Sequence, residues 1–109
     1  MTDDELNAAI AKARGWTPHG DETDSWKIPD SDGESCGLKG SEGWFGWPAF
    51  DIDPAQALAL FAELPEGALF RYGDEYECTW HGVGYGGTVA PTPEQAIAHA
   101  WAQWKRVTE

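Results

Sequence analysis

The stretch ALFRYGDEYECTWHGVGYGGTVA, residues 68–90, decides the fold because its side chains alternate as a half-buried sheet requires. Residues 68–72 alternate between two faces, and residues 75–81 do so again after a turn at Gly73-Asp74. A third run, residues 85–89, follows a cluster of glycines. The pattern predicts three antiparallel strands joined by tight turns.

Three amphipathic helices are predicted around these strands, at residues 1–14, 54–64 and 93–106. Asp53 and Thr92 each stand at an N-cap position with proline directly after, which favours a helix start. Thr92 is also followed by glutamine at the capping-box position. The predicted inward faces are Leu6, Ala9, Ile10 and Ala13; Leu58, Phe61 and Leu64; and Ala96, Ile97, Ala100, Trp101 and Trp104.

Residues 15–53 show no sustained period and are predicted to form a long irregular arm, rich in acids and aromatic rings, with a short strand near residues 25–28. In its stretch GWFGWPAF we expect Phe50 to anchor the chain to the core before the next helix. Trp44 is expected to be partly exposed, and Trp47 or Phe45 to close one end of the sheet. The predicted class is a single α+β domain, 1–109: a small antiparallel sheet of three or four strands covered by three helices, plus the arm.

The charge is strongly negative, with 19 Asp and Glu against seven Lys and Arg, a formal net charge of -12 and a pI near 4.4. Residues 1–53 hold twelve of the acids and four of the cations. This charge repels nucleic acid and anionic lipid, and it attracts basic proteins, many of which bind nucleic acid; it also keeps a Trp-rich chain in solution. If the acids bind a partner, we expect the partner surface to consist of Asp21, Glu22, Asp24, Asp30, Asp32, Glu34, Glu42 and Trp44.

Few residues have the type and spacing expected of a catalytic or metal-binding site. Cys78 and His81 have C-x-x-H spacing, with His19 and Cys36 available in the arm, but alternation on a strand points the first two to opposite faces. Cys78 with His99 is the least unsuitable nucleophile pair. The glycines at 82–87 are followed by no helix and so predict a turn rather than a phosphate loop. We predict no cofactor, no metal and no catalytic residues.

Two unpaired cysteines without CxxC spacing predict a reduced protein, placed in the cytoplasm of its host cell. No apolar run approaches the roughly 20 residues that span a bilayer, and no leader-like segment opens the chain, so neither membrane insertion nor export is expected.

Three segments resemble the phage ABA-sandwich domain family of small phage and prophage proteins: DELNAAIAKARGW, FDIDPAQALALFAEL and APTPEQAIAHAWAQW. They cover about half of the chain, and the arm falls outside them. The resemblance implies an antiparallel sheet with helices on its faces. It carries no catalytic residues to this sequence.

Charge, size and resemblance together favour a non-catalytic phage protein that mimics nucleic acid and inhibits a basic host defence protein, as an anti-CRISPR does. A second hypothesis is a small enzyme or ligand-binding module with a pocket between sheet and arm, using Cys78, His81 and Tyr85. A third is an accessory protein that self-associates through the sheet edge as a homodimer.

Overall fold

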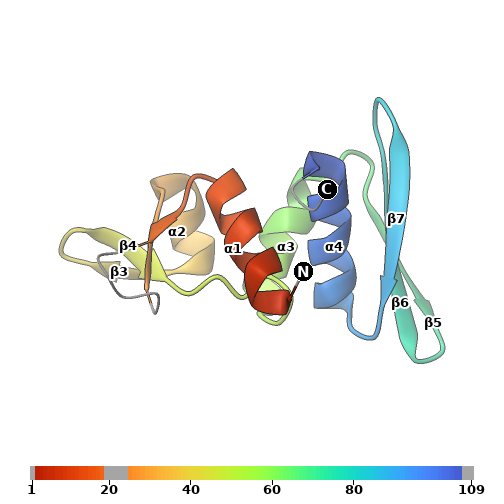
Figure 1. The fold of residues 1–109 in the computed structure, drawn as a ribbon, viewed down its shortest axis with the longest axis horizontal. Helices are drawn as coiled ribbons and strands as arrows, with labels where there is room; N and C mark the ends of the chain where they lie inside the picture. The colour runs from red at the N-terminus through yellow and green to blue at the C-terminus, as the bar shows by residue number, and fades with distance from the viewer. Residues whose placement is uncertain (1, 19–24, 107–109) are drawn as a thin grey trace.

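The computed structural model describes residues 2–18 and 25–106, and within these it confirms the α+β class with four helices and two antiparallel sheets (Figure 1). The chain is elongated, with extents of 42 × 27 × 25 Å. The helices are α1 (Asp3–Ala13), α2 (Asp30–Cys36), α3 (Pro54–Glu63) and α4 (Pro93–Lys105). The strands are β1 (Thr17–Pro18), β2 (Trp26–Ile28), β3 (Leu38–Gly40), β4 (Gly43–Gly46), β5 (Ala68–Tyr72), β6 (Glu75–His81) and β7 (Tyr85–Ala90).

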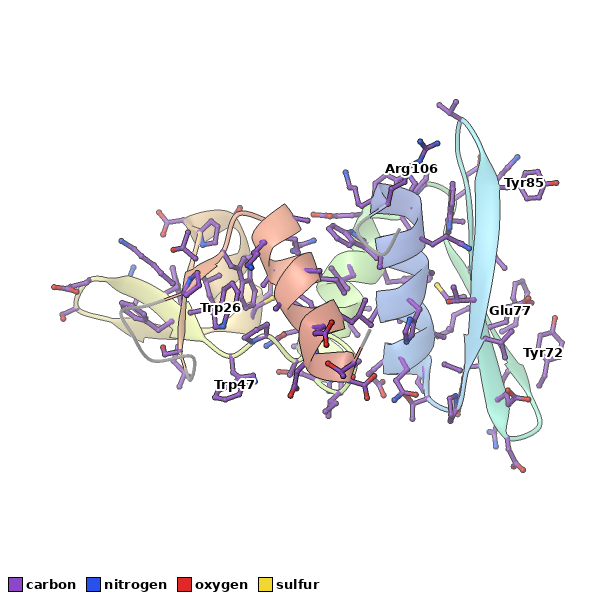
Figure 2. All side chains as sticks on the ribbon, viewed as in Figure 1. Trp26, Trp47, Tyr72, Glu77, Tyr85 and Arg106 are labelled. Atoms are coloured by element: carbon purple, nitrogen blue, oxygen red, sulfur yellow. The ribbon has the colours of Figure 1, made fainter. Side chains whose placement is uncertain are left out.

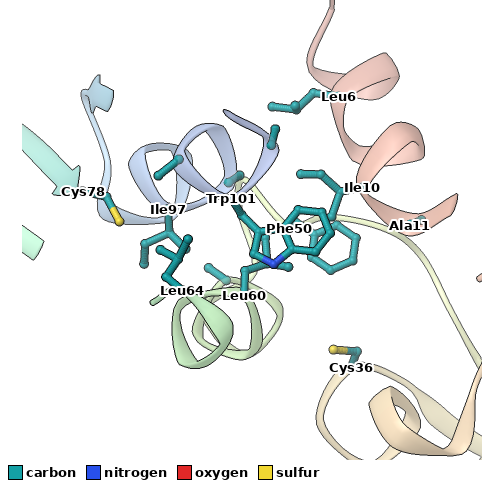
Figure 3. Close-up of a cluster of buried hydrophobic side chains, with 14 of the residues drawn as sticks. Leu6, Ile10, Ala11, Cys36, Phe50, Leu60, Leu64, Cys78, Ile97 and Trp101 are labelled. Carbon is teal, nitrogen blue, oxygen red and sulfur yellow. The ribbon is translucent and has the colours of Figure 1, made fainter. Parts of the chain in front are cut away.

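Helices α1, α3 and α4 form the middle of the molecule, with one sheet at each end (Figure 1). Both predicted helix caps are confirmed. The Asp53 carboxylate accepts a hydrogen bond from the Ala55 N–H at 2.9 Å, and the Thr92 hydroxyl accepts one from the Gln95 N–H at 3.2 Å. Leu58, expected inside, is 65% exposed, because α3 turns Ala57 and Leu60 inward instead. The buried side chains that meet between the three helices are Leu6, Ile10, Phe50, Leu60, Leu64, Ile97 and Trp101 (Figure 3).

The predicted meander is confirmed as the sheet β5-β6-β7. Its inner face packs on α4 through Cys78, which is fully buried, and through the partly buried Tyr76 and Trp80. Its outer face has no helix over it in the described part of the chain, so the cover is one-sided (Figure 1). The large side chains left exposed on that outer face are Phe70, Tyr72, Tyr85 and Val89.

The arm is more regular than predicted. Its described residues form a second antiparallel sheet, in the order β1-β2-β4-β3, with α2 packed on it. The strands are only two to four residues long, and two of them contain glycine, so no period was visible in the sequence. The prediction of an irregular arm is therefore wrong for residues 26–46, the short strand near 25–28 is confirmed, and residues 47–53 are irregular as predicted.

Buried polar side chains tie the segment before α3 to its neighbours. Gln56 donates to the Trp47 carbonyl at 2.8 Å and accepts from the Ala49 N–H at 2.7 Å. Asn7 of α1 donates to the Asp51 carboxylate at 2.8 Å. Phe50, which lies between Ala49 and Asp51 in the chain, is fully buried, as expected of an anchor. Its ring centroid lies 5.0 Å from that of Trp16. The segment is therefore held in one position although it is not regular structure.

Candidate functional site

Three of the predicted partner residues are exposed at one end of the molecule. Asp30 and Glu34 lie one turn apart on α2, and Glu42 lies in the turn between β3 and β4. Helix α2 packs directly on β3 and β4, which form the far end of the ribbon (Figure 1). No ion pair within the described part of the chain involves these carboxylates. We call Asp30, Glu34 and Glu42 the acidic end.

Asp32 does not belong to that surface, although it was predicted there. Its side chain is 8% exposed and forms an ion pair with Arg14 through both carboxylate oxygens. The indole N–H of Trp16 donates to the same carboxylate at 2.8 Å. The helical turn directs Asp32 inward, away from Asp30 and Glu34, which sequence reasoning about an irregular arm could not foresee. Asp32 therefore serves the fold and not a partner.

Arg14 joins the arm to the middle of the molecule. Its guanidinium also lies 2.7 Å from the Glu63 carboxylate, which in turn accepts from the Trp101 indole N–H at 3.1 Å. Burial alone would raise the pKa of Asp32, but the hydrogen bonds from Arg14 and Trp16 and the guanidinium charge lower it on balance. Burial would lower the pKa of Arg14, and the two carboxylates raise it. Both groups are thus charged at neutral pH.

Trp44 is intermediate in burial, which confirms the prediction that its ring is partly exposed. Its ring rests on Gly33 of α2, where a Cβ atom would overlap it, and the Lys39 ammonium lies 5.1 Å from the ring centroid. Trp47 or Phe45 was expected to close one end of the sheet, but Trp47 is 52% exposed and does not do so. A proline follows Trp47 directly, and this was the only sequence signal that it lies outside regular structure.

The alternative site at Cys78, His81 and Tyr85 is not assembled. Cys78 faces α4, and burial raises the pKa of its thiol to about 11. His81 and Tyr85 are exposed, and the His81 ring nitrogen lies 3.1 Å from the Glu66 carboxylate. In the described part of the chain, helices α1, α3 and α4 lie between the three-stranded sheet and the sheet of the arm, so these two sheets do not meet (Figure 1). The glycine-rich stretch forms a turn, as predicted, with Gly82 donating to the Gly84 carbonyl.

The other cysteine and histidine of the described residues form no reactive pair. Cys36 is buried, and burial followed by the charge of Asp32 raises the pKa of its thiol to about 11. His99 is exposed on α4 and has no hydrogen bond to Cys78. Across residues 2–18 and 25–106, no group of three His, Cys, Asp or Glu side chains is arranged to hold a metal ion. In the same residues, no helix has the length and apolar character needed to cross a membrane.

Four of the candidate site residues predicted from the sequence lie outside the described residues: His19, Asp21, Glu22 and Asp24. In comparisons with known proteins, no protein-family model matches the chain, and neither a curated protein nor a solved structure does. The resemblance to the phage ABA-sandwich family therefore stays a prediction.

Proposed function

We propose that this is a non-catalytic phage protein that binds the cationic, nucleic-acid-binding surface of a host defence protein in the host cytoplasm, as an anti-CRISPR inhibitor does. The observation that carries the proposal is the acidic end, whose three exposed carboxylates have no ion-pair partner among the described residues. Such carboxylates lose little by meeting a partner's Lys and Arg, because no internal pair has to break.

The distribution of cations supports the same function. Arg14 is committed to Asp32 and Glu63 inside the molecule, and Lys39 lies over the Trp44 ring. With all seven Lys and Arg counted against the 19 Asp and Glu, the net charge is still -12. A field of this sign speeds encounter with a basic surface and disfavours contact with nucleic acid itself. Both cysteines are buried with raised thiol pKa values, which is consistent with a binding role.

The test is capture of host proteins on the immobilised protein, from nuclease-treated lysate, washed with rising NaCl. Retained proteins are then purified and assayed for nucleic-acid binding by mobility shift, with and without this protein. The test variant is Asp30→Asn/Glu34→Gln/Glu42→Gln. Its control, Asp74→Asn/Glu75→Gln/Glu77→Gln, makes the same charge change on the hairpin at the opposite end.

We expect the first variant to bind between about threefold and about 100-fold more weakly and the control to change binding by less than about twofold, since three exposed pairs at roughly 0.2–1 kcal/mol each sum to about 0.6–3 kcal/mol. Binding should weaken steeply with salt. The proposal fails if both variants bind alike, or if the captured protein keeps its nucleic acid at saturating amounts of this protein.

A self-associating accessory protein is the second candidate, favoured by the uncovered outer face of β5-β6-β7. Phe70 and Tyr72 stack there with centroids 6.3 Å apart and are 45% and 61% exposed. The sheet also has two free edges, β5 and β7, within the described chain. Light scattering after gel filtration tests this: a dimer dispersed by Phe70→Ser/Tyr72→Ser supports it, and a monomer at about 100 μM refutes it.

A further inference from the structure

A small cavity opens between the first helix and the arm, and none of the three residues of the acidic end lines it. It has a volume of about 250 Å³ and is lined by Asp4 and Ala8 of α1, Trp26 of β2, and Trp47 with Pro48. Binding sites for small molecules usually measure roughly 300–1,000 Å³, so this cavity suits one side chain rather than a cofactor. We call these five residues the indole pocket.

Two indoles and a carboxylate give the pocket its chemistry. Trp26 is 7% exposed and Trp47 is 52% exposed, so one ring is a mostly buried wall and the other remains accessible to solvent. Figure 2 shows both rings on the arm beside α1. The face of an indole attracts a cation, and attraction is strongest for Trp among the aromatic side chains. A pocket with two such rings therefore favours a positively charged group with an apolar stem.

Asp4 supplies the counter-charge. It is exposed in the first turn of α1, between Asp3 and Glu5, and no ion pair or hydrogen bond of its side chain occurs within the described part of the chain. The rings would also accept a neutral apolar group, but the carboxylate would then have to stay hydrated beside it. Charge complementarity thus selects a cation over a neutral occupant.

The backbone that carries Trp47 and Pro48 is held before any ligand arrives. Gln56 donates to the Trp47 carbonyl and accepts from the Ala49 N–H, which fixes the chain on either side of Pro48. The buried pair of Asn7 and Asp51 fastens α1 to the same segment. A fixed backbone reduces the ordering free energy that binding must overcome.

We propose that the indole pocket binds one Lys or Arg side chain of the basic partner, with the alkyl stem between the indoles and the charged head near Asp4. This inference rests on the proposed function. It adds one specific contact to an interaction that otherwise depends on long-range electrostatic attraction. Anchors of this kind supply much of the affinity of an interface, because a desolvated aromatic pocket retains its partner.

The experiment uses small probes, because a larger cationic ligand could bind the negatively charged surface at many points. The protein is titrated with n-butylammonium, with ethylguanidinium, and with n-butanol as the uncharged control. Binding is followed through the NMR signals of the indole N–H groups. We expect saturable shifts for Trp26 and Trp47 with both cations, shifts at most about one-third as large for Trp44, and no saturation with n-butanol.

Two variants with a matched control complete the test. Asp4→Asn should weaken butylammonium binding about fivefold through loss of one nearby charge, whereas Asp3→Asn, the same change one residue away, should alter it less than twofold. Trp47→Leu should abolish saturation while the far-UV circular dichroism stays native, since this ring is half exposed.

The inference is overturned if n-butanol binds as well as the cations, if all indoles shift alike, or if both aspartate variants behave the same. Failure of the two proposals can be told apart. If capture of a basic host protein depends on the acidic end but the indole signals do not shift with butylammonium, only the inference about the pocket is wrong. If the pocket binds cations while neutralising the acidic end leaves capture unchanged, only the proposed function is wrong.

Discussion

Replacing Asp32 with alanine is the sharpest test of how the arm is attached. The change leaves the Arg14 guanidinium, whose side chain is 6% exposed, with only Glu63 as a partner, and removes the acceptor of the Trp16 N–H. Breaking a buried pair by deleting one partner costs about 3–5 kcal/mol. A domain of this size has roughly 5–15 kcal/mol of stability in total, so the loss is a large share of it.

The assay is urea unfolding at pH 7 followed by Trp fluorescence, with thermal unfolding by circular dichroism. At about 4 °C per kcal/mol for about 100 residues, we expect Tm to fall by about 10–20 °C. Glu34→Ala on the same helix, exposed and without an ion pair, is the matched control and should stay within about 0.5 kcal/mol.

The pH dependence has a definite sign. Because the folded-state pKa of Asp32 is lowered, its contribution is complete above the unfolded value near 4 and disappears as the pH falls through the folded value. The difference between wild type and Asp32→Ala should therefore shrink below about pH 4. A destabilisation under about 1 kcal/mol at pH 7, or one that persists unchanged at pH 3, would refute the buried ion pair.

Three further outcomes are expected. Gly33→Ala places a Cβ atom inside the Trp44 ring and should lower the free energy of unfolding by about 1–3 kcal/mol, measured in urea; an unchanged midpoint contradicts this contact. Phe50→Ala empties a fully buried site and should cost about 3–5 kcal/mol in the same assay, whereas a loss under 1 kcal/mol would show an exposed ring. Native Cys36 and Cys78 should react with a thiol reagent at pH 8 at least about tenfold more slowly than in 6 M urea, since both are buried with pKa values raised to about 11; rapid native labelling of either would argue against its burial.

Periodicity was informative where elements are long enough to repeat a pattern. The strands over residues 68–90 and the helices from Pro54 and Pro93 were predicted because each spans several repeats and has a cap or turn signal. The β-strands of the arm span two to four residues, too few for alternation to be recognised. Their pairing depends on contacts between segments distant in sequence, such as Ile28 with Trp44.

Local patterns and composition were sufficient to predict the fold class, the meander, three of the helices and the strongly negative charge. Which acids are exposed depends instead on how the segments pack. Asp30, Asp32 and Glu34 look alike in the chain, yet one turn of helix directs Asp32 to Arg14 and leaves the other two in solvent. Packing also makes Trp47 the more exposed of the two indoles, since a glycine of α2 lies beneath the Trp44 ring.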